Sequence, residues 1–188
     1  IIPVDFMGLP VQMNELHALA QEHNLWIIED SCHAPGGFYV DQNLEKQFCG
    51  NGKYADLAIF SFHPVKHIAT GEGGMITTNR EDLYQKLLQL RHHGITKDPT
   101  LLQEQHGGWY YEMQELGYNY RLSNLHAALG LSQLQRADAG LAKRRKIASR
   151  YLEAFKGTAV QPLPRTFVEG HAYHLFVVEI PNRKQVYE

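Results

Sequence analysis

A short apolar run that ends at two acidic residues is the feature that most constrains the fold of this chain. Leu25–Ile28 is followed at once by Glu29 and Asp30, and residues 11–23 before it repeat apolar positions at helical spacing. An apolar run of this length is typical of a buried parallel strand. Because α/β folds place their chemistry at the carboxyl ends of such strands, we expect Asp30 to lie at a functional edge.

Further segments continue this alternation of strands and helices. Two more apolar runs, Ala55–Phe62 and Gly73–Thr78, predict buried strands. Helical periodicity predicts helices at Arg80–His93, Leu122–Leu134 and Leu141–Phe155. This order of elements predicts an α/β fold with a mostly parallel sheet.

The boundaries and connections of these elements carry weaker signals. Asn79 is a suitable N-cap for the first of the three helices, and Gly94 is a suitable residue to close it. Residues 41–53 are polar and contain glycine, which predicts a surface loop. Residues 95–116 are predicted to be irregular.

The last apolar run, His174–Ile180, predicts a strand that begins a second, smaller domain. We therefore expect residues 1–156 to form part of a large domain and residues 157–188 to begin a small one. The chain starts at Ile1 without a methionine and stops soon after the last predicted strand. We expect it to be the central part of a longer protein.

The composition is that of an ordinary globular protein, with 44% hydrophobic residues and a net charge of -2. A nearly neutral chain lacks the basic face that nucleic-acid binding needs. No apolar run approaches the roughly 20 residues of a membrane span, and the first residues do not resemble a signal peptide. Cys32 and Cys49 form no disulfide framework. These observations predict a cytoplasmic protein that binds neither membrane nor nucleic acid.

A lysine shortly after the second predicted strand is a candidate for covalent chemistry. Lys66 has apolar neighbours and can lose its charge more easily than a solvated lysine, and a neutral amine forms a Schiff base with an aldehyde. The hydroxyl of Ser61 can donate to a phosphate, while Gly71, Gly73 and Gly74 allow tight turns. Taken alone, Lys66 is equally well interpreted as a lysine of a surface loop.

Asp30 has a specific use if a cation faces it. An acid at the end of a buried strand is desolvated, and a protonated pyridine nitrogen would compensate its charge. Such an ion pair keeps the ring positive, so that the ring accepts electrons from a carbanion during amino-group transfer. By itself, Asp30 also fits a helix N-cap or a surface acid. The order acid, serine, lysine, glycine pair is more specific than any one of its members.

Five sequence motifs together resemble the DegT/StrS family of sugar-nucleotide aminotransferases, and the resemblance covers nearly the whole chain. The sequence of the segment Ser61–Lys66 is most similar to that found in the branch of the family that serves bacterial pseudaminic acid synthesis. The motifs are Pro3–Gly8, Asp30–Ala34, Ser61–Lys66, Gly71–Gly74 and Gly117–Gly130.

The resemblance implies a three-layer α/β/α fold of the aspartate aminotransferase type, fold type I, with pyridoxal 5′-phosphate as cofactor. It implies a transaminase that moves an amino group from L-glutamate to a nucleotide-linked 4-keto-6-deoxy sugar, UDP-linked in the branch named above. Such an enzyme serves surface polysaccharide or nonulosonic acid biosynthesis. It also implies that further amino-terminal and carboxy-terminal parts belong to the complete enzyme.

The resemblance also assigns roles to individual residues. Lys66 would hold the cofactor and move protons at the substrate carbon, and Asp30 would pair with the ring nitrogen. Cys32 would pack on a face of the ring, His33 would approach its phenolic oxygen, and Ser61 would bind the phosphate.

Asn119 would bind the phosphate of a neighbouring subunit, so the resemblance implies a homodimer with shared sites. Arg121 would meet a carboxylate or a sugar phosphate. No metal ligands are implied.

Three other interpretations compete with a transaminase. His63 and His67 are four residues apart, the spacing of a helical metal site, but Pro64 makes a helix unsuitable there. Some relatives are sugar dehydratases that carry histidine in place of the lysine, and Lys66 argues against that reaction. A regulatory or scaffold protein would not need Asp30, Ser61, Lys66 and Asn119 together.

Two surface features have ordinary explanations. The basic run Lys143–Lys146 is expected to be a solvated helix face rather than a nucleic-acid patch. Residues 109–111, Trp-Tyr-Tyr, fit local packing slightly better than a sugar pocket or a dimer interface.

Overall fold

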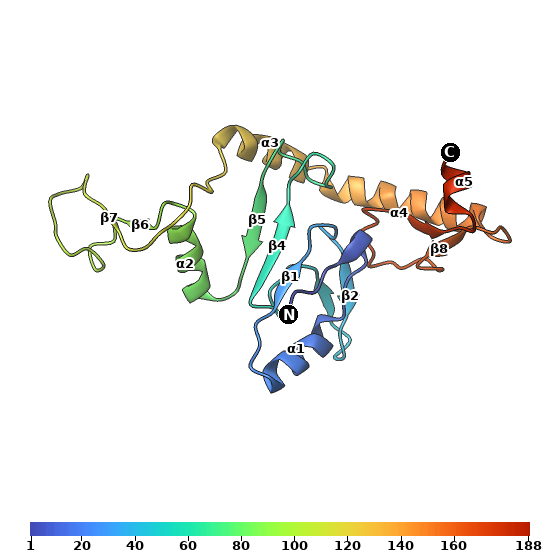
Figure 1. The fold of residues 1–188 in the computed structure, drawn as a ribbon, viewed down its shortest axis with the longest axis horizontal. Helices are drawn as coiled ribbons and strands as arrows, with labels where there is room; N and C mark the ends of the chain where they lie inside the picture. Colours follow the sequence, from blue (N-terminus) through green and yellow to red (C-terminus); the bar gives the residue numbers. More distant parts are fainter.

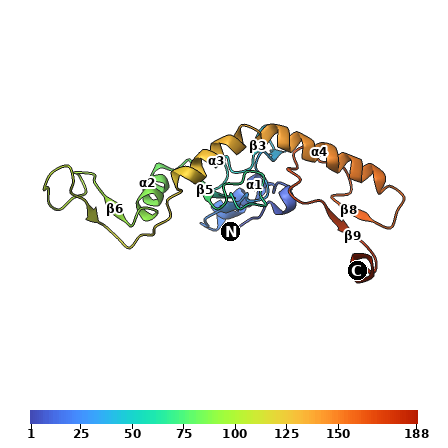
Figure 2. The same ribbon diagram turned by 90° about the horizontal axis from the view of Figure 1, so that it is seen from above.

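The computed structural model describes residues 1–188 and shows a small central sheet between two extended arms (Figures 1 and 2). The sheet has the order β1–β4–β5, formed by Ile28–Asp30, Leu57–Ser61 and Gly74–Thr77. β1 and β4 are parallel, whereas β4 and β5 are antiparallel. The expected mostly parallel sheet is therefore wrong for β5. A parallel neighbour needs a crossover, usually a helix, and residues 62–73 between these two strands form turns without a helix.

The first strand begins later than the apolar run suggested. Ile27 is buried, but Leu25 and Trp26 are 47% and 52% exposed. The guanidinium of Arg80 lies 5.0 Å from the centre of the Trp26 ring. Trp26 therefore covers a cation at the surface instead of filling the core.

The core beside β1 is built by α1 (Met13–Glu22) and a hairpin. Met13 and Ala20 of the helix pack with Ile27 and Tyr39. The hairpin consists of β2 (Phe38–Val40) and β3 (Lys46–Phe48), which are antiparallel. The predicted surface loop at residues 41–53 is thus wrong in part.

A buried carboxylate explains why this polar segment is ordered. Asp41 is 4% exposed, and its two oxygens accept hydrogen bonds from main chain and side chains. The donors are Asn43 N, Glu45 N, Gln47 Nε2 and Tyr54 Oη, at 2.8–3.0 Å. The polar residues that suggested a solvated loop therefore satisfy each other inside it.

One arm follows β5 and contains α2 (Glu81–Leu90), β6 (Ile95–Thr96) and β7 (Glu112–Met113) (Figure 1). Arg80 occupies the N-cap of α2 without a side-chain hydrogen bond. The predicted Asn79 cap is wrong because the Asn79 amide donates to the carbonyl of Asn51 at 2.9 Å instead.

The other arm is carried by α4 (Ala137–Ala154), which follows α3 (Asn124–Leu134). Beyond α4 lie the antiparallel strands β8 (Gln161–Leu163) and β9 (Val177–Glu179), then α5 (Arg183–Tyr187) (Figures 1 and 2). None of the helices is both long and apolar enough to cross a bilayer.

The segment before β9 returns to the central sheet and packs on η1 (Phe6–Gly8). The Ala172 amide donates to the Gly8 carbonyl at 2.7 Å, and the Leu175 amide donates to the Met7 carbonyl at 3.2 Å. Gly8 has a φ of +96°, and a Cβ there would lie 2.9 Å from both His33 O and Tyr173 N. Only glycine fits this backbone contact.

Two carboxyl groups lie together beneath β1. Asp5 and Glu29 are 1% and 4% exposed, and their oxygens lie within 4.8 Å of each other. Ser31 Oγ donates to Asp5 at 3.0 Å, and the Gly50 amide donates to Glu29 at 3.0 Å. Burial, followed by the negative charge of Asp5, raises the pKa of Glu29 to about 7. We therefore expect Glu29 to keep its proton in mildly acidic solution.

We predict that the wild-type protein loses stability as the pH rises above 4.5 and that the Glu29→Gln variant does not show this loss. The folded chain binds the Glu29 proton more tightly than the unfolded chain, so this stabilisation falls as pH rises from 4.5 to about 7. That interval corresponds to roughly 3 kcal/mol at most. In urea unfolding, the glutamine variant should be more stable than wild type at pH 8 and similar to it near pH 4.5.

A matched control is Glu15→Gln, since Glu15 is exposed on α1. It should follow the wild-type pH profile. A Glu29→Gln protein with the wild-type profile would show that this carboxyl group ionises normally.

Candidate active site

The parallel pairing of β1 and β4 brings Asp30 and Ser61 to the same edge of the sheet. Asp30 lies opposite Ile59 in the register, and Ser61 ends β4 two residues later. The Ser31 amide donates to the Ile59 carbonyl at 3.0 Å, which continues the pairing past the end of β1. Two of the predicted cofactor residues therefore leave neighbouring strands in the same direction.

Cys32 lies directly beside Asp30. The Cys32 amide donates to Asp30 Oδ1 at 3.1 Å, and its Sγ lies 3.8 Å from the Ile59 carbonyl oxygen. Burial, followed by the hydrogen bond and the charge of Asp30, raises the pKa of the Cys32 thiol to about 12, and the charge of Lys66 opposes this shift. At neutral pH, the thiol is therefore a small apolar contact surface rather than a nucleophile.

His33 is held by a main-chain donor. The Met7 amide donates to His33 Nδ1 at 3.3 Å. Burial lowers the pKa of His33, the charge of Lys66 lowers it further, and the charge of Asp30 opposes both. The imidazole is therefore neutral at physiological pH.

Lys66 follows β4 on a tight turn, in which its amide donates to the His63 carbonyl at 2.9 Å. The Ser61 hydroxyl accepts from the His63 amide at 3.3 Å, so one turn positions both residues. The Lys66 side chain is partly buried. Lys66 and Asp30 form no ion pair, although the charges of both act on Cys32 and His33. Five of the six predicted residues thus gather at one edge.

Asn119 lies outside this group. It forms an isolated β-bridge with His92, and the flanking amides of Tyr118 and Tyr120 donate to Leu90 and Arg91 at the end of α2. No hydrogen bond joins Asn119 to the other five residues. Within one chain, the structure therefore does not bring the predicted phosphate ligand to the cluster.

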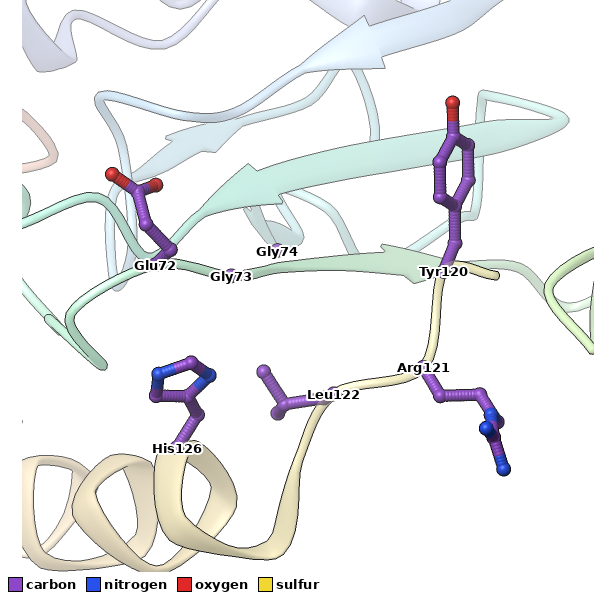
Figure 3. Close-up of a pocket in the computed structure, with 7 residues that line it drawn as sticks. All are labelled: Glu72, Gly73, Gly74, Tyr120, Arg121, Leu122 and His126. Carbon is purple, nitrogen blue, oxygen red and sulfur yellow. The ribbon is translucent and has the colours of Figure 1, made fainter. Parts of the chain in front are cut away.

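A pocket of about 220 Å³ lies beside the glycine-rich turn that follows the Lys66 loop (Figure 3). Leu122 and His126 point toward this turn, while the Arg121 side chain points away from it. A Cβ at Gly73 would lie 2.7 Å from Thr70 Oγ1 and 2.9 Å from Leu122 Cδ1. Glycine at position 73, where φ is +154°, therefore suits the close approach of Leu122, which precedes α3. The contact expected for Arg121 stays a prediction.

Sequence reasoning missed part of the surroundings of Lys66. His67 and His174 pack behind the lysine, with ring centroids 5.4 Å apart. Arg144 donates to the carbonyls of Tyr173 and His174, at 3.2 and 3.3 Å. The expectation of a fully solvated basic face on α4 is thus wrong for this arginine. Of the two histidines with metal-site spacing, His63 is exposed, whereas the His67 ring packs on His174.

The aromatic residues of the long arm form a local cluster. The rings of Trp109 and Tyr110 meet edge to face at 5.8 Å, and Tyr110 Oη donates to Glu112 at 2.9 Å. Trp109 is 70% exposed. Local packing thus accounts for Tyr110 but not for Trp109.

Comparison with known proteins agrees with this arrangement. The profile of the DegT/DnrJ/EryC1/StrS aminotransferase family matches residues 1–188. The chain belongs to this family. Its residues are 43% identical over 153 positions to UDP-4-amino-4,6-dideoxy-N-acetyl-beta-L-altrosamine transaminase of Campylobacter jejuni, covering 81% of this chain and 37% of that protein.

Solved structures of the family have the same fold. Helicobacter pylori PseC, an aminotransferase of pseudoaminic acid biosynthesis, matches with a TM-score of 0.80 and 31% identity over 97% of this chain and 46% of that one. The PLP form of Streptococcus pneumoniae Spr1654, described as a sugar aminotransferase, matches with a TM-score of 0.78 and 27% identity over 97% and 48%. These matches confirm the predicted fold class. This chain spans less than half the length of the relatives it matches.

The cofactor of the family is pyridoxal phosphate, and the residues of the cluster fit it. An amine, a carboxylate and a hydroxyl lie at one strand edge, on Lys66, Asp30 and Ser61. Because Lys66 and Asp30 form no ion pair with each other, each of them can interact with a different atom of the cofactor ring. When bound, the cofactor supplies an acceptor for the electrons of a carbanion. The individual roles of these residues stay predictions.

We predict that Cys32 reacts slowly with iodoacetamide at pH 8 in the folded, cofactor-free protein. Its raised pKa leaves little thiolate, so alkylation should be at least about tenfold slower than in the urea-unfolded chain. Asp30→Asn keeps an acceptor for the Cys32 amide but removes the charge, and it should accelerate the reaction several-fold. Peptide mapping by mass spectrometry separates Cys32 from Cys49.

Asp98→Asn, at an exposed position in the distant arm, serves as the control and should leave the rate unchanged. Equal rates for wild type and Asp30→Asn would mean that the carboxylate does not act on the thiol.

Proposed function

We propose that this chain carries the cofactor site of a pyridoxal-phosphate-dependent aminotransferase that moves an amino group from L-glutamate to a nucleotide-linked 4-keto-6-deoxy sugar, with UDP as the nucleotide. The observation that carries the proposal is the convergence of Lys66, Asp30 and Ser61 at one edge of the sheet. Similarity to a UDP-sugar transaminase and to PseC supports the choice of substrate class.

Each residue has a physical task in this proposal. The Lys66 amine holds the cofactor covalently and, when released, moves a proton to or from the reacting carbon. Asp30 keeps the ring nitrogen protonated, and the Ser61 hydroxyl donates to the phosphate. Cys32 offers an un-ionised sulfur to the ring face, and His33 donates to the phenolic oxygen. A lysine at position 66 favours amino transfer over the dehydratase reaction.

We also propose a homodimer in which Asn119 completes the site of the partner subunit. Asn119 lies apart from the cluster of its own chain. The adjoining helix α3 has no buried residue, and four of its leucines are exposed, namely Leu125, Leu129, Leu131 and Leu134. An apolar helix that is exposed on this scale is typical of an interface.

Two further assignments remain proposals. Residues 1–156 would belong to the large domain and residues 157–188 to the small one, with β8 and β9 as its first strands. The cytoplasm is the compartment that suits free thiols, and Cys32 and Cys49 are both free.

We predict that the protein loaded with pyridoxal phosphate is yellow, and that borohydride reduction bleaches it and labels Lys66. Lys66→Ala should lose the label and at least about a thousandfold of the glutamate-dependent amination of UDP-linked keto-sugars, since the covalent route is removed. Mass spectrometry reads both outcomes, and dTDP-linked keto-sugars test the choice of nucleotide.

Lys143→Ala is the matched control, because Lys143 is exposed on α4. Full amination by Lys66→Ala, or a label on another lysine, would refute the proposed mechanism.

We predict that two inactive variants restore each other when they are mixed. A dimer of one Lys66→Ala and one Asn119→Ala subunit has one site with both residues intact and one with neither. After subunit exchange of an equal mixture, about a quarter of the wild-type activity should return. No recovery in a mixture shown by mass spectrometry to contain the heterodimer would refute shared sites.

A further inference from the structure

Three imidazole rings pack in a row near Lys66, and the proposed reaction uses only one of them. The ring centroids of His33 and His174 are 4.4 Å apart at an interplanar angle of 30°, and those of His174 and His67 are 5.4 Å apart at 43°. The rings come from the loop after β1, from the lysine loop and from the segment before β9. His174 is the middle ring, so its position bears on both others.

His174 is fixed by its main chain rather than by its own polar atoms. The Arg144 guanidinium donates to its carbonyl at 3.3 Å, and the next amide, of Leu175, donates to the Met7 carbonyl at 3.2 Å. Its Nδ1 is buried and has no hydrogen-bond partner, as is also true of His67 Nε2. The ring therefore acts on its neighbours through its faces.

The surroundings of the stack keep its rings neutral. Burial, followed by nearby positive charges, lowers the pKa of His67 to about 3 and that of His174 to about 4. The positive charges of Arg144 and Lys66 act in the same direction on both rings. For His33, burial and Lys66 lower the pKa, and Asp30 is the single acid that opposes them. No acid offsets the two cations at the other two rings.

The neutral His33 ring has only one available donor. Its Nδ1 accepts from the Met7 amide, so the proton of the neutral ring lies on Nε2. A second proton on Nδ1 would abolish that hydrogen bond and place a cation near Lys66. His174 covers one face of this half-buried ring, with the centroids 4.4 Å apart, and reduces the access of the water that would solvate an imidazolium.

We propose that His174 is a positioning residue, whose stacked ring holds His33 as a neutral imidazole with Nε2–H as its single donor, aimed at an oxygen of the cofactor. The last clause rests on the proposed function. The state of the His33 ring does not, because it is a property of the cofactor-free protein.

The first test follows the imidazole nitrogens of His33 by ¹⁵N NMR over a pH titration of the cofactor-free protein. In the wild type, we expect a neutral ring with the proton on Nε2 and a pKa below 6.5. In His174→Ala, the ring should become solvated, and its pKa should move toward 6.5. His174→Phe keeps a stacking ring and removes a buried nitrogen without a partner, so it should resemble the wild type.

His23→Ala is the control, because His23 is exposed at the end of α1. The proposal is overturned if His174→Ala leaves the proton position and pKa of His33 unchanged, or if His174→Phe behaves as alanine does. A loss of folding cannot imitate the expected result, because the phenylalanine variant retains the packing volume.

The second test measures the affinity for pyridoxal phosphate and the pH dependence of its visible absorbance. Loss of one aromatic contact should weaken binding about 2- to 10-fold in His174→Ala. If His174 acts through His33, the same substitution should have no further effect in a His33→Ala background. Additive losses would overturn the proposal.

The two tests distinguish a failure of the proposed role of His174 from a failure of the proposed function. A wild-type protein that fails to bind pyridoxal phosphate contradicts the proposed function, while the titration of His33 still decides the role of His174.

Discussion

The parallel register of β1 and β4 is the constraint on which the rest of the site depends. It makes two strands end at the same edge, so that residues 30 and 61 leave the sheet together. The turn after β4 then brings Lys66 back toward Cys32 and His33. A slip of one residue would reverse the faces of β1 and separate these groups. The buried Asp5 and Glu29 carboxyl groups connect this strand region to its surroundings, because they accept hydrogen bonds from Ser31 and Gly50.

Those parts of the site that depend on short-range order could be predicted from the sequence. Asp30 lies at a strand end because an apolar run stops just before it. Ser61 lies near the end of the second predicted strand, and Lys66 lies on the loop that follows. The family resemblance assigned the fold type, which the similarity to solved structures confirms. The role of Asn119 in a partner subunit stays a prediction, because a single chain does not test it.

Non-local packing could not be predicted in the same way. An apolar sequence does not by itself distinguish exposed from buried positions, so the pattern predicts a buried strand at Leu25 and Trp26 although both are exposed. Arg144 was assigned to a solvated face because its two acceptors lie about thirty residues further along the chain. His174 contacts His33 across a still greater sequence distance, and no local pattern marks such a pair.

The missing side chain of Gly8 has a consequence for how this protein can change over time. Three main-chain segments meet at that point with no room for a methyl group, since a Cβ would lie 2.9–3.0 Å from atoms of residues 33, 173 and 174. Any larger residue would displace the segment before β9 and, with it, His174. The long arm at residues 97–111 can accept insertions without such a penalty, so we expect variation among descendants to accumulate there and position 8 to remain invariant.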